Sequence, residues 1–180
     1  EESRMFLPFL EKMPDNVLVL VAHSLSKSYT LYGMRCGALI CMAKTREIAE
    51  EFKSVCEFSS RGSWSNCARA PQVILQKIYE DDRLLQKVME ERKSFRDMLL
   101  KRGAAFKKAA EEAGLEMVPF RGGFFATVPC EAPDKVSAQL ETMGIFTVPF
   151  TKGIRVSLAS VKEEKCRELP KAIKEAIESK

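Results

Sequence analysis

The stretch VLVLVAHSLSKSYTLYGMRCGALICMA, residues 17–43, contains two apolar runs separated by a polar segment. The runs Val17–Ala22 and Cys36–Ala43 have the continuous apolar character of strands that are buried on both faces of a largely parallel sheet. They predict an α/β fold. Only about two such strands precede the helical region, so the sheet that they predict is incomplete.

The polar segment between these runs holds Lys27, with Arg35 eight positions later. A lysine amine becomes a nucleophile toward carbonyl groups when desolvation or a nearby cation disfavours its ammonium form. Lys27 would stand just beyond the carboxyl end of a strand, where open α/β sheets bind their ligands. The hydroxyls of Ser24 and Ser26 and the guanidinium of Arg35 suit a phosphate group. An ordinary surface lysine in a polar loop is the alternative.

Helical spacing dominates the middle of the chain. Apolar residues at helical intervals predict a helix over 45–58, a polar turn over 59–66 and a second helix over 71–79. A long helix is expected over 81–113, where an apolar stripe ends at Gly114.

The last third changes to short elements. Strands are expected at 124–128, 146–150 and 154–159, with a helix over 136–143 between the first two. Ser160 and Glu163 predict a capping box for a final helix, and Pro170 predicts a kink within it. These elements predict a small α+β domain. In the strand at 154–159, alternation points the side chain of Arg155 away from Ile154 and Val156.

Composition excludes several classes of protein. The 180 residues are 46% hydrophobic and 30% charged, with a net charge of +4. The sequence lacks the dense basic stripe that would predict a nucleic-acid partner, and no apolar run reaches the length of a membrane span. His23 is the only histidine, so the chain cannot form a histidine-based triad or a His-rich metal site, and no metal is expected. Reduced, buried thiols are expected over disulfides or zinc. The six cysteines are at 36, 41, 56, 67, 130 and 166.

Three motifs carry a resemblance to a known family. The segment SLSKSYTLYGMRCG (24–37) resembles the cofactor-lysine segment of class I aminotransferases, the aspartate and aromatic group of fold type I. RGSWSN (61–66) resembles the aspartate-subgroup segment with a second substrate arginine, and GIRVSLAS (153–160) resembles the strand with the arginine for the substrate α-carboxylate. The order and separation of the motifs fit that family from about Val17 onward.

The resemblance implies an architecture and a cofactor. The chain would be the carboxyl-terminal portion of a longer enzyme that uses pyridoxal 5′-phosphate. Residues 1–80 would form part of the cofactor-binding large domain, with a partial parallel sheet and helices. Residues 81–113 would form a long interdomain helix, and 114–180 the small α+β domain. The groups that stack on the cofactor ring and pair with its pyridine nitrogen would lie in the missing part, so this segment alone should be inactive.

The resemblance also implies roles for individual residues. Lys27 would bind the cofactor covalently and transfer protons, while Arg35, Ser24 and Ser26 would bind its phosphate. Arg155 would bind the substrate α-carboxylate, and Arg61 the side-chain carboxylate of an aspartate-like or glutamate-like substrate.

The resemblance further implies an amino acid and a 2-oxo acid as substrates, a cytoplasmic homodimer, and a role in amino-acid metabolism and biosynthesis. Tyr32 is interpreted as a packing or loop residue. The chain departs from the family pattern at Cys67 and Ala68, where prolines are common, and at Met34, where a polar residue is usual. A lyase or decarboxylase of the same fold is an alternative, and so is a non-catalytic domain without a ligand.

Overall fold

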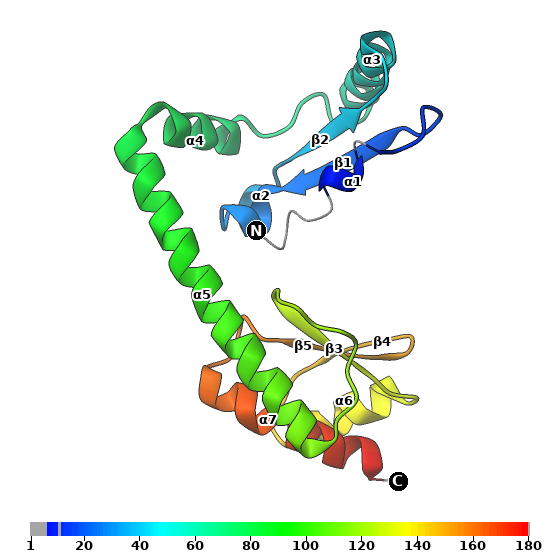
Figure 1. Cartoon of the computed structure of the whole chain (residues 1–180), viewed down its shortest axis with the longest axis vertical. Helices are drawn as coiled ribbons and strands as arrows, with labels where there is room; N and C mark the ends of the chain where they lie inside the picture. The colour runs from blue at the N-terminus through cyan, green and yellow to red at the C-terminus, as the bar shows by residue number, and fades with distance from the viewer. Residues whose placement is uncertain (1–6, 11, 180) are drawn as a thin grey trace. The chain divides into compact units, whose positions relative to one another are not determined.

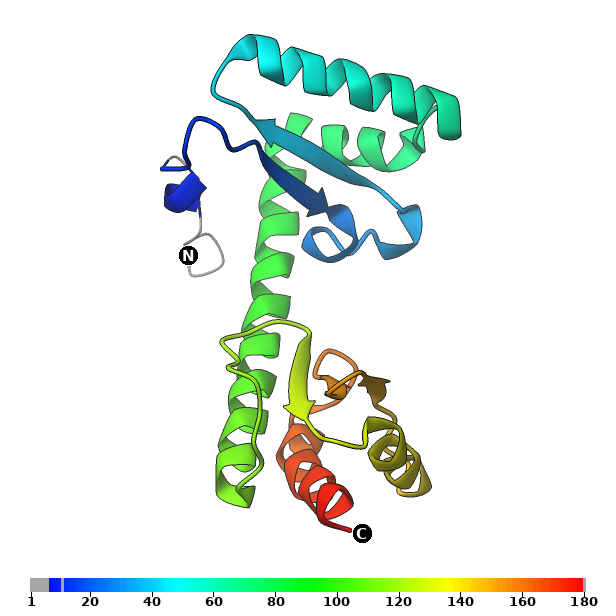
Figure 2. The same cartoon turned by 90° about the vertical axis from the view of Figure 1, so that its right-hand side faces the viewer.

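The computed structural model describes residues 7–10 and 12–179. The chain divides into two compact units, unit 1 (Glu1–Met89) and unit 2 (Glu90–Lys180). Figures 1 and 2 show the helices and strands of each unit, which mix in an α/β fold as expected. A one-turn helix, α1 (Leu7–Leu10), comes first. None of the helices in the described residues combines the length and apolar character of a membrane span.

Unit 1 is built on two paired strands, β1 (Val19–Ser24) and β2 (Gly37–Met42). The register runs from Val19 opposite Met42 to Ser24 opposite Gly37, and the strands are antiparallel. The parallel arrangement expected for this pair is therefore wrong. The reason is the connection at residues 25–36, which turns the chain back at the end of β1 and joins the neighbouring ends of the two strands.

The expected burial of this pair on both faces is also wrong. Leu20, Leu39 and Ile40 are each about half exposed, and Leu39 has an exposed fraction of 54%. Helix α3 (Arg46–Ser63) packs against β2. Among the described residues, α3 leaves much of the apolar surface of the two strands in contact with solvent.

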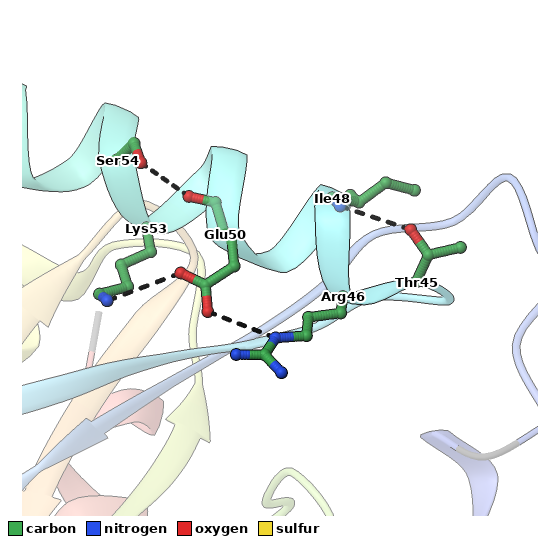
Figure 3. A network of polar contacts seen from close by, with 6 residues as sticks. All are labelled: Thr45, Arg46, Ile48, Glu50, Lys53 and Ser54. Carbon is green, nitrogen blue, oxygen red and sulfur yellow. Dashed lines mark hydrogen bonds and ion pairs between the residues drawn. The ribbon is translucent and has the colours of Figure 1, made fainter.

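Helix α3 begins where its sequence provides a cap. The Thr45 hydroxyl accepts a hydrogen bond from the backbone N–H of Ile48 at 3.4 Å, as Figure 3 shows. Glu50 then forms ion pairs with Arg46 at 3.9 Å and with Lys53 at 3.6 Å. The Ser54 hydroxyl donates to the Glu50 carbonyl at 2.9 Å. These contacts hold the first turns of the helix.

The end of α3 differs from the prediction. The helix continues through Ser63, so the polar turn expected from Ser59 begins only at Trp64. The Ser63 hydroxyl donates to the Ser59 carbonyl at 2.8 Å. Such back-bonding satisfies a serine side chain within a helix, which explains why this serine-rich stretch does not end it.

Two further helices confirm the predictions for the middle of the chain. Helix α4 spans Arg69–Glu80 and helix α5 spans Asp82–Ala113. The Asp81 carboxylate caps α5 by accepting from the N–H groups of Arg83 at 2.9 Å and Leu84 at 3.1 Å. Gly114, at φ +63°, ends it. The Leu115 N–H then bonds to the Ala110 carbonyl at 2.8 Å, which is the Schellman pattern of helix ends.

Unit 2 contains a three-stranded antiparallel sheet. Its strands are β3 (Phe125–Pro129), β4 (Val148–Phe150) and β5 (Gly153–Ser157), in the order β3-β5-β4. Helix α6 (Pro133–Thr142) and helix α7 (Glu163–Glu178) pack against each other, and α6 also contacts β4 and β5. Figure 2 shows these elements at the C-terminal end of the chain. The expected strands and helices of this region are confirmed.

The hydrophobic core of the described chain lies in unit 2. Alternate residues of β3 and β5 face α6, α7 and the end of α5, so one face of the sheet is buried and the other is open. The core comprises Phe106, Ala110, Leu115, Ala126, Val128, Val136, Leu140, Ile154, Val156, Leu158, Cys166, Leu169, Ile173 and Ala176.

The start of α7 corrects another prediction. Lys162 is the capping residue, but its side chain makes no capping hydrogen bond, while the Ser160 hydroxyl donates to the Ser157 carbonyl at 3.2 Å. Because α7 begins at Glu163, that residue occupies the first helical position and not the third, where a capping box needs it. The helix continues through Pro170, which is buried.

The cysteines are all free thiols in this structure. Cys166 is buried, whereas Cys67 is exposed, so the expectation of buried thiols is wrong for Cys67. Burial raises the pKa of Cys166; Arg102 lowers it and Glu163 raises it by smaller amounts. Burial also raises the pKa of Cys130.

Candidate functional site

Lys27 lies just beyond the carboxyl end of β1, in the single helical turn α2 (Leu25–Ser28). The Ser24 hydroxyl starts this turn by accepting from the backbone N–H of Ser26 at 3.2 Å. Accepting that bond leaves the hydroxyl hydrogen of Ser24 available for a ligand oxygen. The position predicted for Lys27, at the end of a strand, is confirmed.

Leu25 closes the connection that holds Lys27. Its side chain is buried, and its N–H donates to the Cys36 carbonyl at 3.1 Å. Its own carbonyl accepts from the N–H groups of Tyr29 at 3.2 Å and Leu31 at 3.3 Å. These bonds join both ends of the connection, so Arg35, next to Cys36, returns to the neighbourhood of α2.

The ring of Tyr32 contacts both candidate cations. The Lys27 Nζ lies 4.3 Å from the ring centroid, and the Arg35 Cζ lies 5.4 Å from it. Arg35 also donates from Nη1 to the Tyr32 carbonyl at 3.1 Å. The structure therefore brings the predicted amine and the predicted guanidinium against one ring.

The backbone of this connection is strained at two positions. Thr30 and Arg35 have φ values of 55° and 50°, in the left-handed region that non-glycine residues seldom adopt. Such conformations occur often at ligand sites, where the surrounding structure holds them in place.

Gly37 lets the two strands meet where the connection begins and ends. A Cβ atom at Gly37 would lie 2.5 Å from the His23 carbonyl oxygen, which is closer than any side chain can approach. Gly37 stands opposite Ser24 in the register of β1 and β2. The glycine therefore holds the strand end that carries Ser24 and Lys27 close to the strand that follows Arg35.

Arg61 lies in the last turn of α3, where the prediction had placed it in a polar turn. Its Nη1 donates to the Ser65 hydroxyl at 2.5 Å, and Ser65 has a φ of 71°. Arg61 lines an open groove of about 760 Å³. The other lining residues are Leu39, Cys41, Ala49, Phe52, Lys53, Cys56, Glu57, Ser60, Ser65 and Asn66.

Arg155 lies on the open face of the unit 2 sheet. Its neighbours along β5, Ile154 and Val156, are buried, so the predicted direction of the Arg155 side chain is confirmed. The Arg155 Cζ lies 4.5 Å from the centroid of the Phe125 ring on β3. The guanidinium thus rests on an aromatic ring at the surface of the unit.

Two aromatic residues of these sites were missed in the sequence. Tyr32 was interpreted as a packing or loop residue, yet it is 62% exposed and contacts two cations. Phe125 lies in an expected strand, but the sequence does not predict its contact with Arg155. One signal could have indicated this contact. Thr127 pairs with Arg155, and Phe125 lies two residues from Thr127, so it is a diagonal neighbour of Arg155 on the same face of the sheet.

The donor set around Tyr32 fits one kind of ligand. A primary amine can react with an aldehyde, and a guanidinium can bind a phosphate together with serine hydroxyls. Pyridoxal phosphate carries both groups, so Lys27, Arg35, Ser24 and Ser26 fit it chemically. Within residues 7–10 and 12–179, no cluster of His, Cys, Asp and Glu side chains could hold a metal ion.

Comparisons with known proteins agree with this chemistry. The family model described as aminotransferase class I and II matches residues 2–173. A crystal structure of an aminotransferase from Anaerococcus prevotii is 36% identical, with a TM-score of 0.92. It aligns with 99% of this chain and 43% of its own. No curated protein sequence matches the chain significantly.

More distant structures share the fold. The aspartate aminotransferase of Plasmodium falciparum is 19% identical, with a TM-score of 0.71, and aligns over 100% of this chain and 45% of its own. An aromatic-amino-acid aminotransferase from Burkholderia pseudomallei, solved with pyridoxal phosphate covalently bound, is 24% identical with a TM-score of 0.62. It aligns over 91% of this chain and 41% of its own. The chain thus spans less than half the length of these solved proteins.

Proposed function

The chain belongs to the class I and class II aminotransferases, and from this premise we propose that the full-length protein is a pyridoxal-phosphate-dependent aminotransferase. It would move an amino group between an amino acid and a 2-oxo acid. The observation that carries the proposal is the contact of Lys27 and Arg35 with one ring, just beyond the end of β1.

Lys27 would have two tasks in this reaction. Its amine would hold the cofactor covalently, and after the substrate amine has replaced it, the freed amine would move a proton at the substrate Cα. Pyridoxal phosphate, when bound, supplies an electron sink for the negative charge that develops there. The placement of Lys27 on a hydrogen-bonded turn supports both tasks, because the turn limits where the amine can reach.

Arg35, Ser24 and Ser26 would bind the cofactor phosphate. A guanidinium forms paired, charge-assisted hydrogen bonds to phosphate oxygens, and a hydroxyl adds a further donor. A guanidinium has five N–H donors. Arg35 would therefore either give up its hydrogen bond to the Tyr32 carbonyl when it binds the phosphate, or keep that bond with one nitrogen and bind the phosphate with the others.

Arg155 would bind the substrate α-carboxylate. The two ions would pair through two parallel hydrogen bonds, which a lysine cannot reproduce. The exposure of the Arg155 side chain on the open sheet face supports this role, because the guanidinium is accessible there and no ion pair of the described residues occupies it.

Arg61 would set the preference for a dicarboxylic substrate by binding its side-chain carboxylate. Its groove beside Ser65 and Asn66 offers further polar donors. We also propose that the protein works as a homodimer, as the sequence resemblance implies, and that it is cytoplasmic, which agrees with the expectation of reduced thiols.

The first experiment tests the cofactor attachment. We would reduce the full-length protein with borohydride in the presence of pyridoxal phosphate and map the modified peptide. The adduct is expected on Lys27, and Lys27→Ala should abolish the cofactor absorbance. Lys44→Ala, an exposed lysine that pairs with Asp15, is the matched control. An adduct on another lysine, or none, would contradict the proposal.

The second experiment tests the reaction and its specificity. Pairs of amino acids and 2-oxo acids are screened with the full-length protein. An aminotransferase forms a new amino acid from the added 2-oxo acid without releasing ammonia or carbon dioxide, which distinguishes it from a lyase or a decarboxylase. Arg61→Ala should reduce kcat/KM for dicarboxylic substrates and leave other substrates unchanged. Unchanged rates with aspartate and glutamate would remove the role given to Arg61.

A further inference from the structure

Tyr32 is an exposed aromatic residue that touches two candidate cofactor residues at once. Its ring contacts the Lys27 ammonium and the Arg35 guanidinium, and its carbonyl accepts a hydrogen bond from Arg35. It lies in a one-turn 3-10 helix, η2 (Tyr32–Met34), between the two strained residues Thr30 and Arg35. The local backbone therefore holds the ring where both cations can reach it.

Two physical effects make this contact useful. Lysine and arginine side chains have large rotamer freedom, and fixing each costs free energy that a ligand must otherwise offset. Two like charges that approach each other also repel. The negative face of an aromatic ring attracts both cations, so it limits their freedom and partly compensates their repulsion. Lys27 gives up this contact when its amine loses a proton to bind the aldehyde, whereas Arg35 stays charged.

We propose that Tyr32 is a positioning residue, which holds the Lys27 amine and the Arg35 guanidinium in place before the cofactor binds. This inference rests on the proposed function and adds a residue to it. The ring is the active part, because the carbonyl that bonds to Arg35 belongs to the backbone and is present with any side chain. The two ring contacts do not involve the Tyr32 hydroxyl.

The test uses the cofactor-free full-length protein and two probes that separate the cations. Pyridoxal has the aldehyde without the phosphate and reports on Lys27, whereas pyridoxine 5′-phosphate has the phosphate without the aldehyde and reports on Arg35. Tyr32→Leu should weaken pyridoxine 5′-phosphate by about 2- to 5-fold, as measured by titration calorimetry. Pyridoxal should not bind more weakly, because its imine needs the uncharged Lys27 amine and the ring favours the ammonium.

Two further variants are the controls. Tyr32→Phe keeps the ring and should bind both probes with a Kd within about 2-fold of that of the unsubstituted protein. A difference of that size is smaller than the effect of losing one cation–π contact. Phe58→Leu removes an exposed aromatic ring of the same unit, on α3, and should not change binding. A Tyr32→Leu variant that binds pyridoxine 5′-phosphate as tightly as the unsubstituted protein would overturn the inference. So would a Tyr32→Phe variant that binds as weakly as Tyr32→Leu.

A measurement without substitution of Tyr32 completes the test. The lysines are converted to ¹³C-dimethyl-lysine, which keeps its charge, and the Lys27 resonance is assigned through Lys27→Arg. Its methyl signal is expected upfield of the other lysines because of the ring current, and a signal among the others would overturn the inference. If the borohydride adduct maps to Lys27 while these tests fail, only the role of Tyr32 is wrong. If the adduct maps elsewhere, the proposed function fails.

Discussion

Unit 1 and unit 2 place their apolar side chains differently. In unit 2, both the sheet and the helices contribute to one buried core. In the described part of unit 1, the buried apolar side chains are Leu25, Pro71 and Ile78, while Leu39, Phe58 and Trp64 are exposed. All four candidate cofactor residues are in unit 1, whereas Arg155, a candidate substrate residue, is in unit 2. The difference indicates that the residues which stabilise the fold are largely separate from those proposed to bind the cofactor.

The strongest test of this contrast compares one phenylalanine from each unit. Phe106 is fully buried in the core, whereas Phe58 has an exposed fraction of 83%. Phe106→Ala should lower the free energy of unfolding by about 3–5 kcal/mol, because it removes buried contacts and leaves a cavity. Phe58→Ala should change it by less than about 0.5 kcal/mol. Urea unfolding of the chain, followed by the hydrogen exchange of α7 amides for Phe106 and of α3 amides for Phe58, measures the two effects.

An equal cost for the two substitutions would contradict the contrast. It would mean that Phe58 is covered in solution and that unit 1 has a core of its own.

Two glycines in equivalent positions allow a second comparison. A Cβ at Gly153 would lie 2.5 Å from the Val128 carbonyl oxygen, and a Cβ at Gly37 would lie 2.5 Å from that of His23. Either alanine must push two strands apart, at a cost of about 1–3 kcal/mol. Gly153→Ala should lower the melting temperature of unit 2. Gly37→Ala should weaken pyridoxal phosphate binding, because it displaces the strand end that carries Ser24 and Lys27.

Calorimetric melting and a cofactor titration separate the two outcomes. The comparison fails if Gly153→Ala reduces cofactor binding as much as Gly37→Ala does.

The sequence predicted the elements better than their environment. Apolar periodicity located nearly every helix and strand, and alternation in β5 predicted the direction of Arg155, because these features depend on residues close in sequence. The length of α3 was not predicted. Serine-rich stretches often end helices, but here the Ser63 hydroxyl bonds to a carbonyl of the preceding turn and the helix continues. The exposure of Leu39 was not predicted. An apolar residue in a sequence indicates a tendency to be buried, but the sequence does not show which other residues would cover it.

The candidate site shows the same division. The motif identified Lys27 and Arg35 as a pair, but the role of Tyr32 depends on the turn between them. That turn requires positive φ values at Thr30 and Arg35, residue types that do not signal such a conformation. Contacts made across an irregular turn therefore need the structure.

The pH dependence of stability offers a third comparison. Burial raises the pKa of the Cys166 thiol. The unfolded chain then loses this proton at lower pH than the folded chain, so the contribution of the thiol is intact below about pH 8.5 and is lost as pH rises through the folded pKa. Cys166→Ala should be less stable at pH 7 because of the cavity, and its difference from the unsubstituted chain should narrow by pH 10.

Urea unfolding at both pH values measures this difference, with Cys67→Ala as the exposed control. A difference that stays constant from pH 7 to pH 10 would show that Cys166 ionises in the folded chain as it does in the unfolded one.

The smallest expected effect concerns Phe125, which supports Arg155 from the stable sheet of unit 2. If the ring orients the guanidinium toward a carboxylate, Phe125→Leu in the full-length protein should raise KM for amino-acid substrates by about 2- to 5-fold. Phe146→Leu, at another exposed phenylalanine of unit 2, should have no effect. Steady-state kinetics with one amino-acid substrate measures both.

A double-mutant cycle then decides whether Phe125 acts through Arg155. Arg155→Lys removes the planar group that stacks on the ring and binds two carboxylate oxygens at once. In that background, Phe125→Leu should have little further effect, because the interaction that it weakens is already absent. Additive effects would mean that the ring contacts the substrate directly. The open face of the sheet would then be a binding surface in itself, and unit 2 would contribute more to substrate recognition than a single arginine.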